Sequence, residues 1–235
     1  LVYLKTTDIQ ARSFKNAYIS FDMQDSWKCN LEQTEWVCRA EDPQEAKEAV
    51  IILTAKETGP TDQIPIYESH MNNPINIVSK TGIATTSTVK YKAQTRKIND
   101  QAWLDGLHQD SEIQNYYTRY LATIKNQIAI LVTFSAHTKF YAKHSPNFDK
   151  TIRSLRVVAT KDLLSHPDLG PIGGPGGQLG QTIGQAMPSD LMAVDEELDS
   201  KGKKSIFKND LFLGFILLII AALIYIGLKI YQKSK

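Results

Sequence analysis

An 18-residue run near the C-terminus, Leu211 to Leu228, contains no charged side chain, and only seven residues follow it. As a helix rising about 1.5 Å per residue it would be about 27 Å long, close to the hydrocarbon thickness of a bilayer. A buried helix of a soluble protein is the alternative, but such helices are usually shorter and carry polar residues on their solvent side. We therefore expect one transmembrane helix at 211–228.

Cys29 and Cys38 are the only cysteines, and eight residues separate them within a stretch rich in strand-forming residues. This spacing suits a disulfide across a β-hairpin, which would stabilise the fold by about 2.7 kcal/mol in the chain-entropy model. Two unpaired buried thiols are the alternative, and the neighbourhood offers too few further ligands for a metal site. A disulfide would indicate an oxidising compartment.

Charge alone does not decide which side of the membrane the N-terminal part occupies, because lysines flank both ends of the apolar run. The chain begins at Leu1, as it would after removal of a signal peptide, although a chain cut at another boundary would begin in the same way. Together with the cysteines, this favours an inner-membrane protein with a periplasmic or other extracytoplasmic domain and a short basic cytoplasmic tail at 229–235. A tail-anchored protein with a cytosolic domain is the alternative.

Composition separates the part before the apolar run into two segments. Residues 1–161 are mixed and periodic, with enough apolar side chains for one core of ordinary domain size. Residues 162–210 contain the Gly- and Pro-rich stretch GPIGGPGGQLGQTIGQ and then a charged stretch, and have little to bury against a large backbone entropy cost. We interpret 162–210 as a tether with a root-mean-square reach of about 35–40 Å.

The charge balance argues against a nucleic acid as partner. Residues 1–160 carry 19 Lys and Arg against 17 Asp and Glu, and the whole chain has a net charge of +2. A nucleic-acid-binding domain would concentrate positive charge on one surface. Within the tether, three lysines follow an acidic run and would either face anionic headgroups or remain solvated: Lys201, Lys203 and Lys204.

Alternation of side chains predicts an antiparallel sheet with few helices, an α+β domain. Strands are expected at 17–21, 36–40, 49–58, 87–97, 103–107, 116–125 and 128–134. The last of these is apolar on both faces, as expected of a central strand covered on both sides. A short helix is expected at 62–71, with Pro65 in its first turn, and a closing helix after the central strand, with Phe148 and Ile152 at helical spacing.

The strand expected at 87–97 would have one apolar and one basic face. Its residues alternate between two sets: Val89, Tyr91, Ala93 and Thr95, and Lys90, Lys92, Gln94 and Arg96. Alternate side chains project on one side, so Lys90, Lys92 and Arg96 would form a ridge able to contact an acidic partner or lipid headgroups. An ordinary solvated face is the alternative.

No motif predicts catalysis. His137 and His144 lie seven apart on the expected closing helix but lack a third metal ligand. The sequence has no Gly-x-Ser-x-Gly, and its Gly-rich stretch lacks the Lys-Ser/Thr ending of a phosphate-binding loop. The acidic pair Asp105 and Asp110 is not distinguished by its spacing from ordinary solvated acids. We expect no enzyme, no cofactor and no metal.

Four passages carry a resemblance: ISFDMQDSWK (19–28), AVIILTAKET (49–58), INDQAWLDG (98–106) and ILVTFSAHTKFYAKHSPNFDKTIRSLRV (130–157). They resemble the PsbP-like α/β/α sandwich family, which includes an extrinsic photosystem II subunit, a Ran-binding import factor and bacterial envelope proteins. The resemblance lies in packing patterns, and it implies a non-enzymatic domain that docks on larger assemblies. The chain departs from the family in its cysteine pair, its tether and its apolar C-terminal run.

Two functions of different classes are consistent with these features. The first is a non-enzymatic, single-pass accessory or scaffold subunit whose extracytoplasmic domain docks on or regulates a larger integral membrane complex. The second is an envelope ligand-binding receptor or hydrolase with a site assembled from distant residues, which would require a pocket with convergent polar groups and shifted pKa values. The candidate partner or lipid contacts are Lys90, Lys92, Arg96, Lys201, Lys203 and Lys204.

Overall fold

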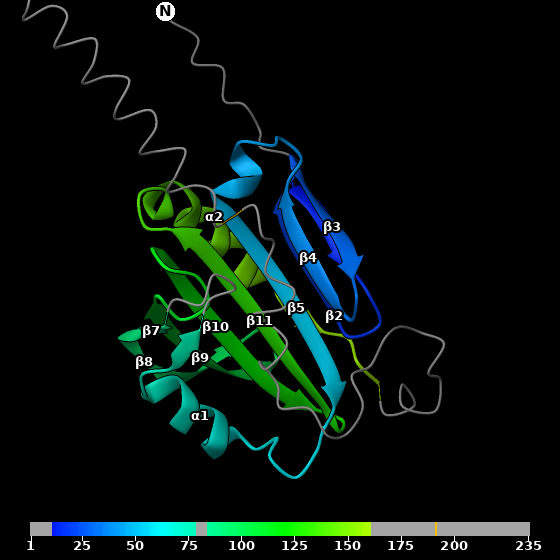
Figure 1. Ribbon diagram of the computed structural model, residues 1–235. Helices are drawn as coiled ribbons and strands as arrows, with labels where there is room; N and C mark the ends of the chain where they lie inside the picture. Colours follow the sequence, from blue (N-terminus) through cyan, green and yellow to red (C-terminus); the bar gives the residue numbers. More distant parts are fainter. Residues whose placement is uncertain (1–10, 79–83, 161–190, 192–235) are drawn as a thin grey trace, which may run out of the picture. The chain divides into compact units, whose positions relative to one another are not determined.

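The computed structural model describes residues 11–78, 84–160 and 191 (Figure 1). The chain divides into two compact units, 1–192 and 193–235, and all described residues belong to the first. The predicted membrane span and the tail after it lie outside the described residues. Within the described ranges, neither α-helix has the length and apolar character needed to cross a bilayer.

Seven antiparallel strands form the main sheet of an α+β domain (Figure 1). In spatial order they are β3 (Trp27–Glu32), β4 (Glu35–Ala40), β5 (Ala49–Glu57), β11 (Ile128–His137), β10 (Tyr116–Lys125), β9 (Gln101–Gln109) and β8 (Thr88–Ile98). Strands β3 and β8 are therefore its edges. The prediction of a mainly antiparallel sheet with few helices is confirmed.

The central strand β11 is covered on both faces, as predicted, and all ten of its residues are buried. Ile130 and Val132 join a hydrophobic cluster on one face, while Leu131 joins a second cluster on the other. Because neither face meets water, the first half of the strand, Ile128 to Val132, shows no polar alternation, and the polar residues of its second half, Thr133, Ser135 and His137, are buried as well.

The first face is covered by α2 (Tyr141–Ser154) and by a small sheet of β1 (Ala11–Lys15), β2 (Ile19–Gln24) and β12 (Arg156–Val157). Helix α2 directs Phe148 and Ile152 into the core, at the spacing that predicts the closing helix. Trp27 and Trp103 are buried in the same cluster.

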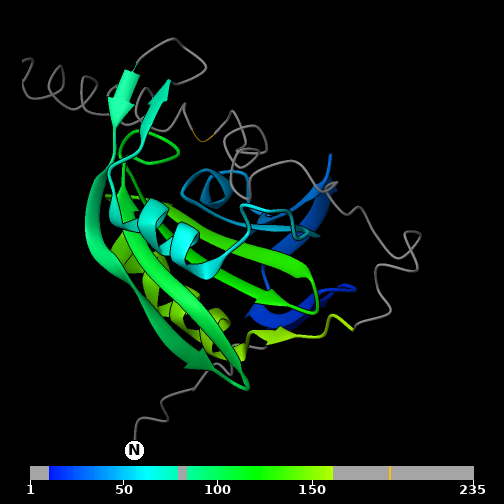
Figure 2. The same cartoon turned by 90° about the horizontal axis from the view of Figure 1, so that it is seen from below.

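The second face is covered by α1 (Ile64–Asn72), which packs against β8, β9 and β10 (Figure 2). Pro65 lies in its first turn, as predicted, where a missing N–H costs no helical hydrogen bond. A short hairpin of β6 (Asn76–Val78) and β7 (Ala84–Thr86) leads from α1 to β8. Leu191, from the predicted tether, is buried in the cluster on this face.

Tight turns fix the register of the β3–β4 and β10–β11 hairpins. Gln33 has a φ of 57° between β3 and β4, and Cys29 stands directly opposite Cys38. A disulfide joins the two cysteines, which confirms that prediction. Asn126 and Gln127 have φ values of 52° and 62°, as in the two-residue turns that match the twist of a β-hairpin.

One prediction about the closing helix is wrong. His137 is the last residue of β11, so it does not share a helix with His144. The strand extends beyond the apolar run because the His137 N–H donates to the Glu48 carbonyl, 2.9 Å away. The His137 ring also packs edge-on against Tyr116, with 5.2 Å between ring centroids.

Candidate functional site

The edge strand β8 contains two irregularities that change which side chains share a face. Its register with β9 shifts on both sides of Tyr91, which stands opposite Leu107. Arg96 stands opposite Trp103, on the same face of β9 as Leu107. The predicted division of β8 is therefore wrong: Tyr91 lies on the face of Arg96, because extra residues in a strand reverse its alternation.

Helix α1 and a glycine hold the irregular segment in place. The Ala93 N–H donates to Asn72 Oδ1 at the end of α1, 2.8 Å away. Ala93 is buried, and a Cβ placed on Gly106 would lie 3.4 Å from its Cβ atom. The absence of a side chain at Gly106 lets β8 approach β9 closely at this point.

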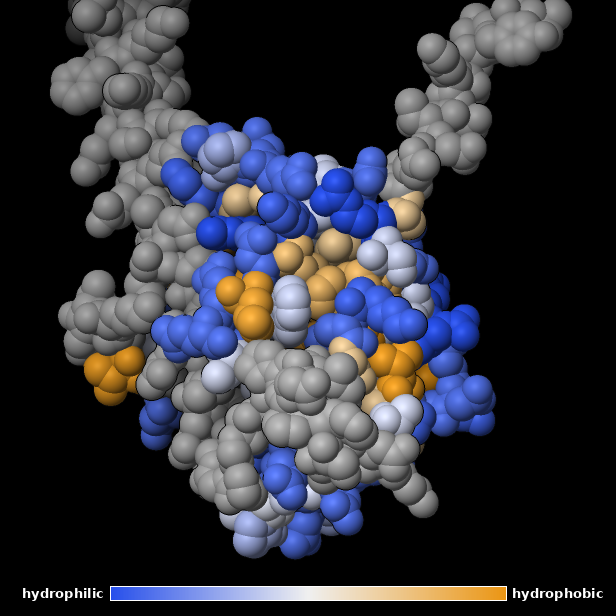
Figure 3. Space-filling model, turned by 90° about the vertical axis from the view of Figure 1, so that its right-hand side faces the viewer, coloured by the Kyte–Doolittle hydropathy of each residue, from blue (hydrophilic) through white to orange (hydrophobic). Residues whose placement is uncertain are grey.

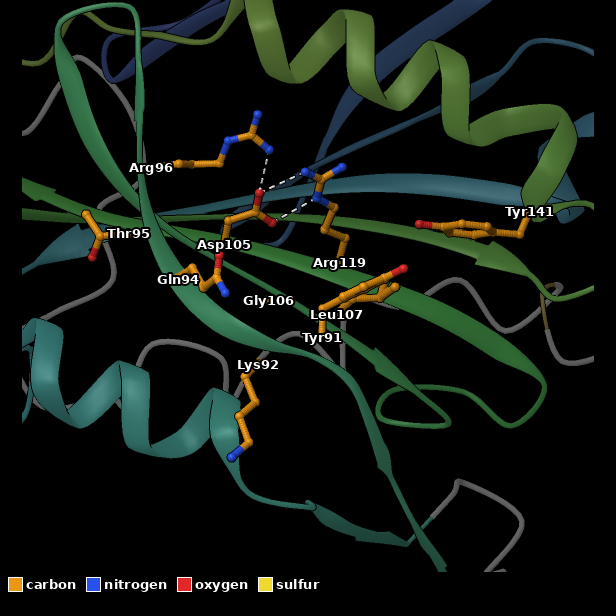
Figure 4. Close-up of a pocket in the computed structure, with 10 residues that line it drawn as sticks. All are labelled: Tyr91, Lys92, Gln94, Thr95, Arg96, Asp105, Gly106, Leu107, Arg119 and Tyr141. Atoms are coloured by element: carbon orange, nitrogen blue, oxygen red, sulfur yellow. Dashed lines mark hydrogen bonds and ion pairs between the residues drawn. The ribbon is translucent and has the colours of Figure 1, made fainter.

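The irregular part of β8 borders a cavity of about 420 Å³ (Figure 4). Its main side chains come from four elements: Tyr91, Lys92, Gln94 and Arg96 on β8, Asp105 and Leu107 on β9, Arg119 on β10 and Tyr141 on α2. We call it the β8 groove. It is assembled from residues up to 50 positions apart in sequence.

A chain of four charged side chains runs from the β8 groove to helix α2. Asp105 accepts hydrogen bonds from Arg119 Nε and Nη2, at 2.8 and 2.7 Å, and from Arg96 Nη1 at 2.8 Å. Arg119 Nη1 also reaches Asp149 Oδ1 on α2, 2.8 Å away. Arg119 thus ties the helix to the sheet through two carboxylates, with the bidentate geometry that makes such pairs strong.

Burial and charge act in opposite directions on Asp105. Its side chain is 11% exposed, and burial opposes ionisation, but the hydrogen bonds and charges of Arg119 and Arg96 outweigh that effect and lower the pKa of the carboxyl. The Asp105 hydrogen bonds, against the opposing effect of burial, raise the pKa of Arg119. The cluster therefore stays fully ionised near neutral pH and suits binding rather than proton transfer.

The groove also presents groups to solvent. Tyr91 is 70% exposed, and the Arg96 side chain is 47% exposed. Among the described residues, Arg96 is bonded only to Asp105 and only through Nη1, so its other nitrogens remain able to donate (Figure 4). Tyr141 packs against Tyr117 with 4.9 Å between ring centroids, and burial raises its pKa. The groups that the groove exposes to solvent are therefore the Tyr91 ring and the Arg96 nitrogens other than Nη1.

A different surface lies on the side where β3 forms the edge. Figure 3 shows apolar side chains gathered there and bordered by hydrophilic ones. Leu31 on β3 is among the few large apolar side chains that are exposed within the described residues.

A second polar cluster involves the loop between β9 and β10. The Tyr120 hydroxyl donates to Glu112 Oε1 and lies 2.8 Å from Ser111 Oγ. Burial raises the pKa of Glu112 to about 7; the Tyr120 hydrogen bond opposes this rise, and the negative charge of Glu35 adds to it. Glu112 is thus a carboxyl that titrates near neutral pH.

The three buried histidines of the described residues, His108, His137 and His144, have structural contacts. His108 Nε2 lies 2.7 Å from the Met71 carbonyl, which can only accept, so Nδ1 accepts from Ser87 Oγ at 3.1 Å. His144 Nε2 lies 2.8 Å from Glu48 Oε2. Over the described ranges, no three His, Cys, Asp or Glu side chains are grouped as a metal site would require.

The structure brings together only part of the predicted contact set. Lys92 and Arg96 line the β8 groove, and Lys90 is exposed on the same strand. Asp105 and Asp110 do not act as a pair, because Asp110 Oδ1 instead accepts from the Asn115 N–H, 2.6 Å away. The remaining predicted contacts lie outside the described residues: Lys201, Lys203 and Lys204.

Sequence reasoning missed Arg119 and Glu112. Arg119 is the one charged residue between Tyr117 and Thr123 on its face of β10, and this position was a usable signal. Glu112 lies in a loop and carries no local pattern. Its pKa depends on burial and on Glu35, which is distant in sequence.

Comparison with protein-family models gave no match, and comparison with curated proteins gave none either. Among solved structures, the chain is similar to the cyanobacterial PsbP of Synechocystis, at 10% identity over 65% of this chain and 95% of that one, with a TM-score of 0.45. It is also similar to the Saccharomyces cerevisiae Ran-binding protein Mog1p, at 12% identity over 64% of this chain and 97% of that one, with a TM-score of 0.41.

A protein from Bacteroides thetaiotaomicron aligns at 13% identity with a TM-score of 0.36. That alignment covers 63% of this chain but only 48% of the other, so this chain spans about half of its length. The likeness concerns fold alone.

Proposed function

We propose that the chain is a non-enzymatic accessory or scaffold subunit, anchored by one membrane span, whose extracytoplasmic domain docks on or regulates a larger membrane protein complex through the β8 groove. The observation that carries the proposal is the combination, in one groove, of an exposed Tyr91 and cations with unused donors on the edge strand β8, beside an Asp105 carboxylate already neutralised by two arginines. Such a surface is suited to an acidic partner.

Charge along β8 supports the choice of an acidic partner. The strand carries Lys90, Lys92, Arg96 and Lys97, all exposed, and no acidic residue. Lysines on an edge strand also discourage pairing with other sheets, which is their role in many soluble proteins. Protection of an edge strand does not require an exposed aromatic residue such as Tyr91. Aromatic side chains are enriched at protein interfaces, so Tyr91 favours a docking role for this strand.

Two features support the membrane setting. The uncharged run at 211–228 is long enough to span a bilayer. The Cys29–Cys38 disulfide is typical of oxidising compartments, which favours an extracytoplasmic domain over the tail-anchored alternative. A membrane-impermeant lysine reagent applied to intact cells should label the domain; labelling only after lysis would place the domain in the cytosol.

The docking surface is tested by purifying the full chain from its own membrane with detergent. In a Lys92→Glu/Arg96→Glu variant, we expect recovery of co-purifying membrane protein to fall by at least about tenfold, because two attractive contacts become repulsive. Lys15→Glu/Lys28→Glu is the matched control, since both lysines are exposed on other strands. Equal recovery with both variants would reject the β8 groove, and a wild-type chain that purifies alone would reject the accessory role.

A ligand-binding receptor or hydrolase is a second candidate, favoured by Glu112. A carboxyl with a pKa of about 7 that accepts a hydrogen bond from the Tyr120 hydroxyl could exchange protons at neutral pH. Turnover of ester or phosphoester probes by the full chain, abolished by Glu112→Gln, would support this function. Rates equal to those of the variant would leave the cluster with a structural role.

A further inference from the structure

Leu191 lies in the segment predicted to be a tether, yet its side chain is only 1% exposed. It belongs to the hydrophobic cluster on the α1 face, together with Val50 and Ile52 of β5 and Leu131 of β11. These strands are the centre of the main sheet. One residue of the predicted tether is therefore part of the core of the domain.

The main chain at Leu191 is held as well. Tyr116 Oη lies 3.1 Å from the Leu191 carbonyl oxygen and 2.7 Å from the Lys47 carbonyl oxygen. The Tyr116 ring is fixed in turn by its edge-on contact with His137. A side chain in an apolar pocket and a hydrogen bond to the adjacent main chain are the usual elements of peptide recognition.

We propose that the end of the α1 face beside Tyr116 is a leucine-binding pocket that captures the chain's own tether at Leu191. The site is distinct from the β8 groove, because Tyr116 and Leu131 belong to the cluster on the opposite face from Trp103, which shares the face of Arg96. The proposal does not depend on which partner the groove binds.

Capture at Leu191 shortens the connection to the predicted membrane span. Residues 192–210 alone have a root-mean-square reach of about 22–26 Å, against about 35–40 Å for the whole of 162–210. The domain would therefore stay close to the membrane while residue 191 is docked. Release would allow it to search a wider area.

Chain connectivity favours the chain's own leucine over that of a second copy. Residues 161–190 link the last described residue of the domain, Thr160, to Leu191. A site joined to its ligand by the same chain works at an effective concentration of about millimolar. A second copy would have to reach a comparable concentration to compete.

The test uses the full chain in detergent micelles and a protease specific for glutamate. Cleavage after Glu196 or Glu197, identified by product mass, is expected to be slower while Leu191, five residues before Glu196, is docked. In Leu191→Asp we expect cleavage at least about tenfold faster, because a buried leucine is replaced by a charge. Leu179→Asp is the matched control, with the same change in the same predicted tether, and should stay within about twofold of wild type.

Two further measurements keep the result interpretable. Tyr116→Phe removes the hydrogen bond to Leu191 and should accelerate the same cleavage by about two- to tenfold. If tryptophan fluorescence shows that Leu191→Asp unfolds the domain, the cleavage rate of Leu191→Ala is compared with that of wild type instead. Cleavage rates equal to wild type in the Leu191 variants would overturn the proposal, as would a wild-type dimer that Leu191→Asp converts to a monomer, since a second copy would then fill the pocket.

Discussion

Two ion-pair clusters in this domain use the same chemistry at different depths. Lys56 Nζ lies 2.6 Å from Asp62 Oδ2, and the two side chains are 5% and 1% exposed. In the β8 groove, Asp105 and Arg119 are 11% and 19% exposed, and Arg96 is largely accessible. The first cluster, Lys56 and Asp62, is buried throughout, and we call it the sealed cluster. The second, Asp105, Arg119 and Arg96, extends from the core to the solvent, and we call it the graded cluster.

The partners of each cluster explain the difference in role. Asp62 accepts from Lys56, from the Gly59 N–H at 2.6 Å and from the Tyr67 hydroxyl, so it joins β5, the following loop and α1. Asp105 also satisfies several donors, but Arg96, which lines the groove, is bonded among the described residues only through Nη1. A sealed cluster can only hold the fold together, while a graded one can hold the fold and still contact a partner.

The largest expected effect comes from breaking the sealed cluster. Asp62→Ala leaves Lys56, the Gly59 N–H and the Tyr67 hydroxyl without their carboxylate, and removing one member of a buried pair costs about 3–5 kcal/mol. We expect the free energy of unfolding, measured by urea denaturation and tryptophan fluorescence, to fall by that amount.

The control is Lys56→Met/Asp62→Asn, which removes both charges and keeps an acceptor for the other donors. Because replacing a buried pair by neutral groups of similar size is often tolerated, this double variant should be more stable than Asp62→Ala. An Asp62→Ala variant within about 1 kcal/mol of wild type would mean that the cluster is not sealed.

Asp105→Ala should cost less than Asp62→Ala, about 2–3 kcal/mol, because water can reach the arginines that it leaves behind. Thermal unfolding of both variants in the same buffer measures the order. In wild type both aspartates have a lowered pKa in the folded state, so their stabilisation is present above the ordinary pKa of about 3.9. It is lost as the pH falls through the lower folded-state value. A larger loss of stability in Asp105→Ala than in Asp62→Ala would contradict the difference in burial between the two clusters.

Glu112 sharpens the contrast because its pKa shift has the opposite sign. Its folded pKa of about 7 exceeds an ordinary value of about 4.3, so the folded state binds the proton more tightly. Its contribution to stability is fully present below about pH 4.3 and is lost as the pH rises through about 7. We expect this loss to be about 1–3 kcal/mol, measured by urea denaturation across this range.

Glu112→Gln should flatten that part of the pH profile, because the amide does not titrate. Glu68→Gln is the matched control, since Glu68 is exposed on α1 and its substitution should leave the profile unchanged. A wild-type profile that rises between pH 4 and 7 with the same slope as the Glu112→Gln profile would show that the carboxyl ionises normally.

Local patterns carried much of the fold. Consecutive residues of a strand point to opposite faces, so a short stretch of sequence indicates the environment of both faces. This is why the strands β11 and β10 and the Cys29–Cys38 hairpin could be predicted. The position of Pro65 was predictable for the same reason, since it depends only on the first helical turn.

The candidate site was less predictable because its geometry is set by register. Asp105 and Arg119 meet only because β9 and β10 pair as they do, and the irregularities around Tyr91 leave no mark in an alternating sequence. Leu191 was missed because composition describes an average over the segment, whereas burial is decided residue by residue. The basic residues were found, but not the face on which they lie.

The smallest expected effect on stability belongs to Arg96, at the exposed end of the graded cluster. Its bond to Asp105 is an accessible ion pair, so Arg96→Ala should lower the free energy of unfolding by no more than about 1 kcal/mol. Recovery of the membrane partner should nevertheless fall by about tenfold, since a charge-assisted hydrogen bond is lost. Lys97→Ala removes a neighbouring exposed cation that does not line the groove and should change neither quantity.

A fall in partner recovery without a fall in the free energy of unfolding would distinguish a docking role of Arg96 from a structural one. If Arg96 served only to support Asp105, stability and partner recovery would decline together, as they should in Asp105→Ala. If it serves the partner, recovery falls while the unfolding curve barely moves. A large loss of stability in Arg96→Ala, or undiminished recovery, would remove the reason for treating the graded cluster differently from the sealed one.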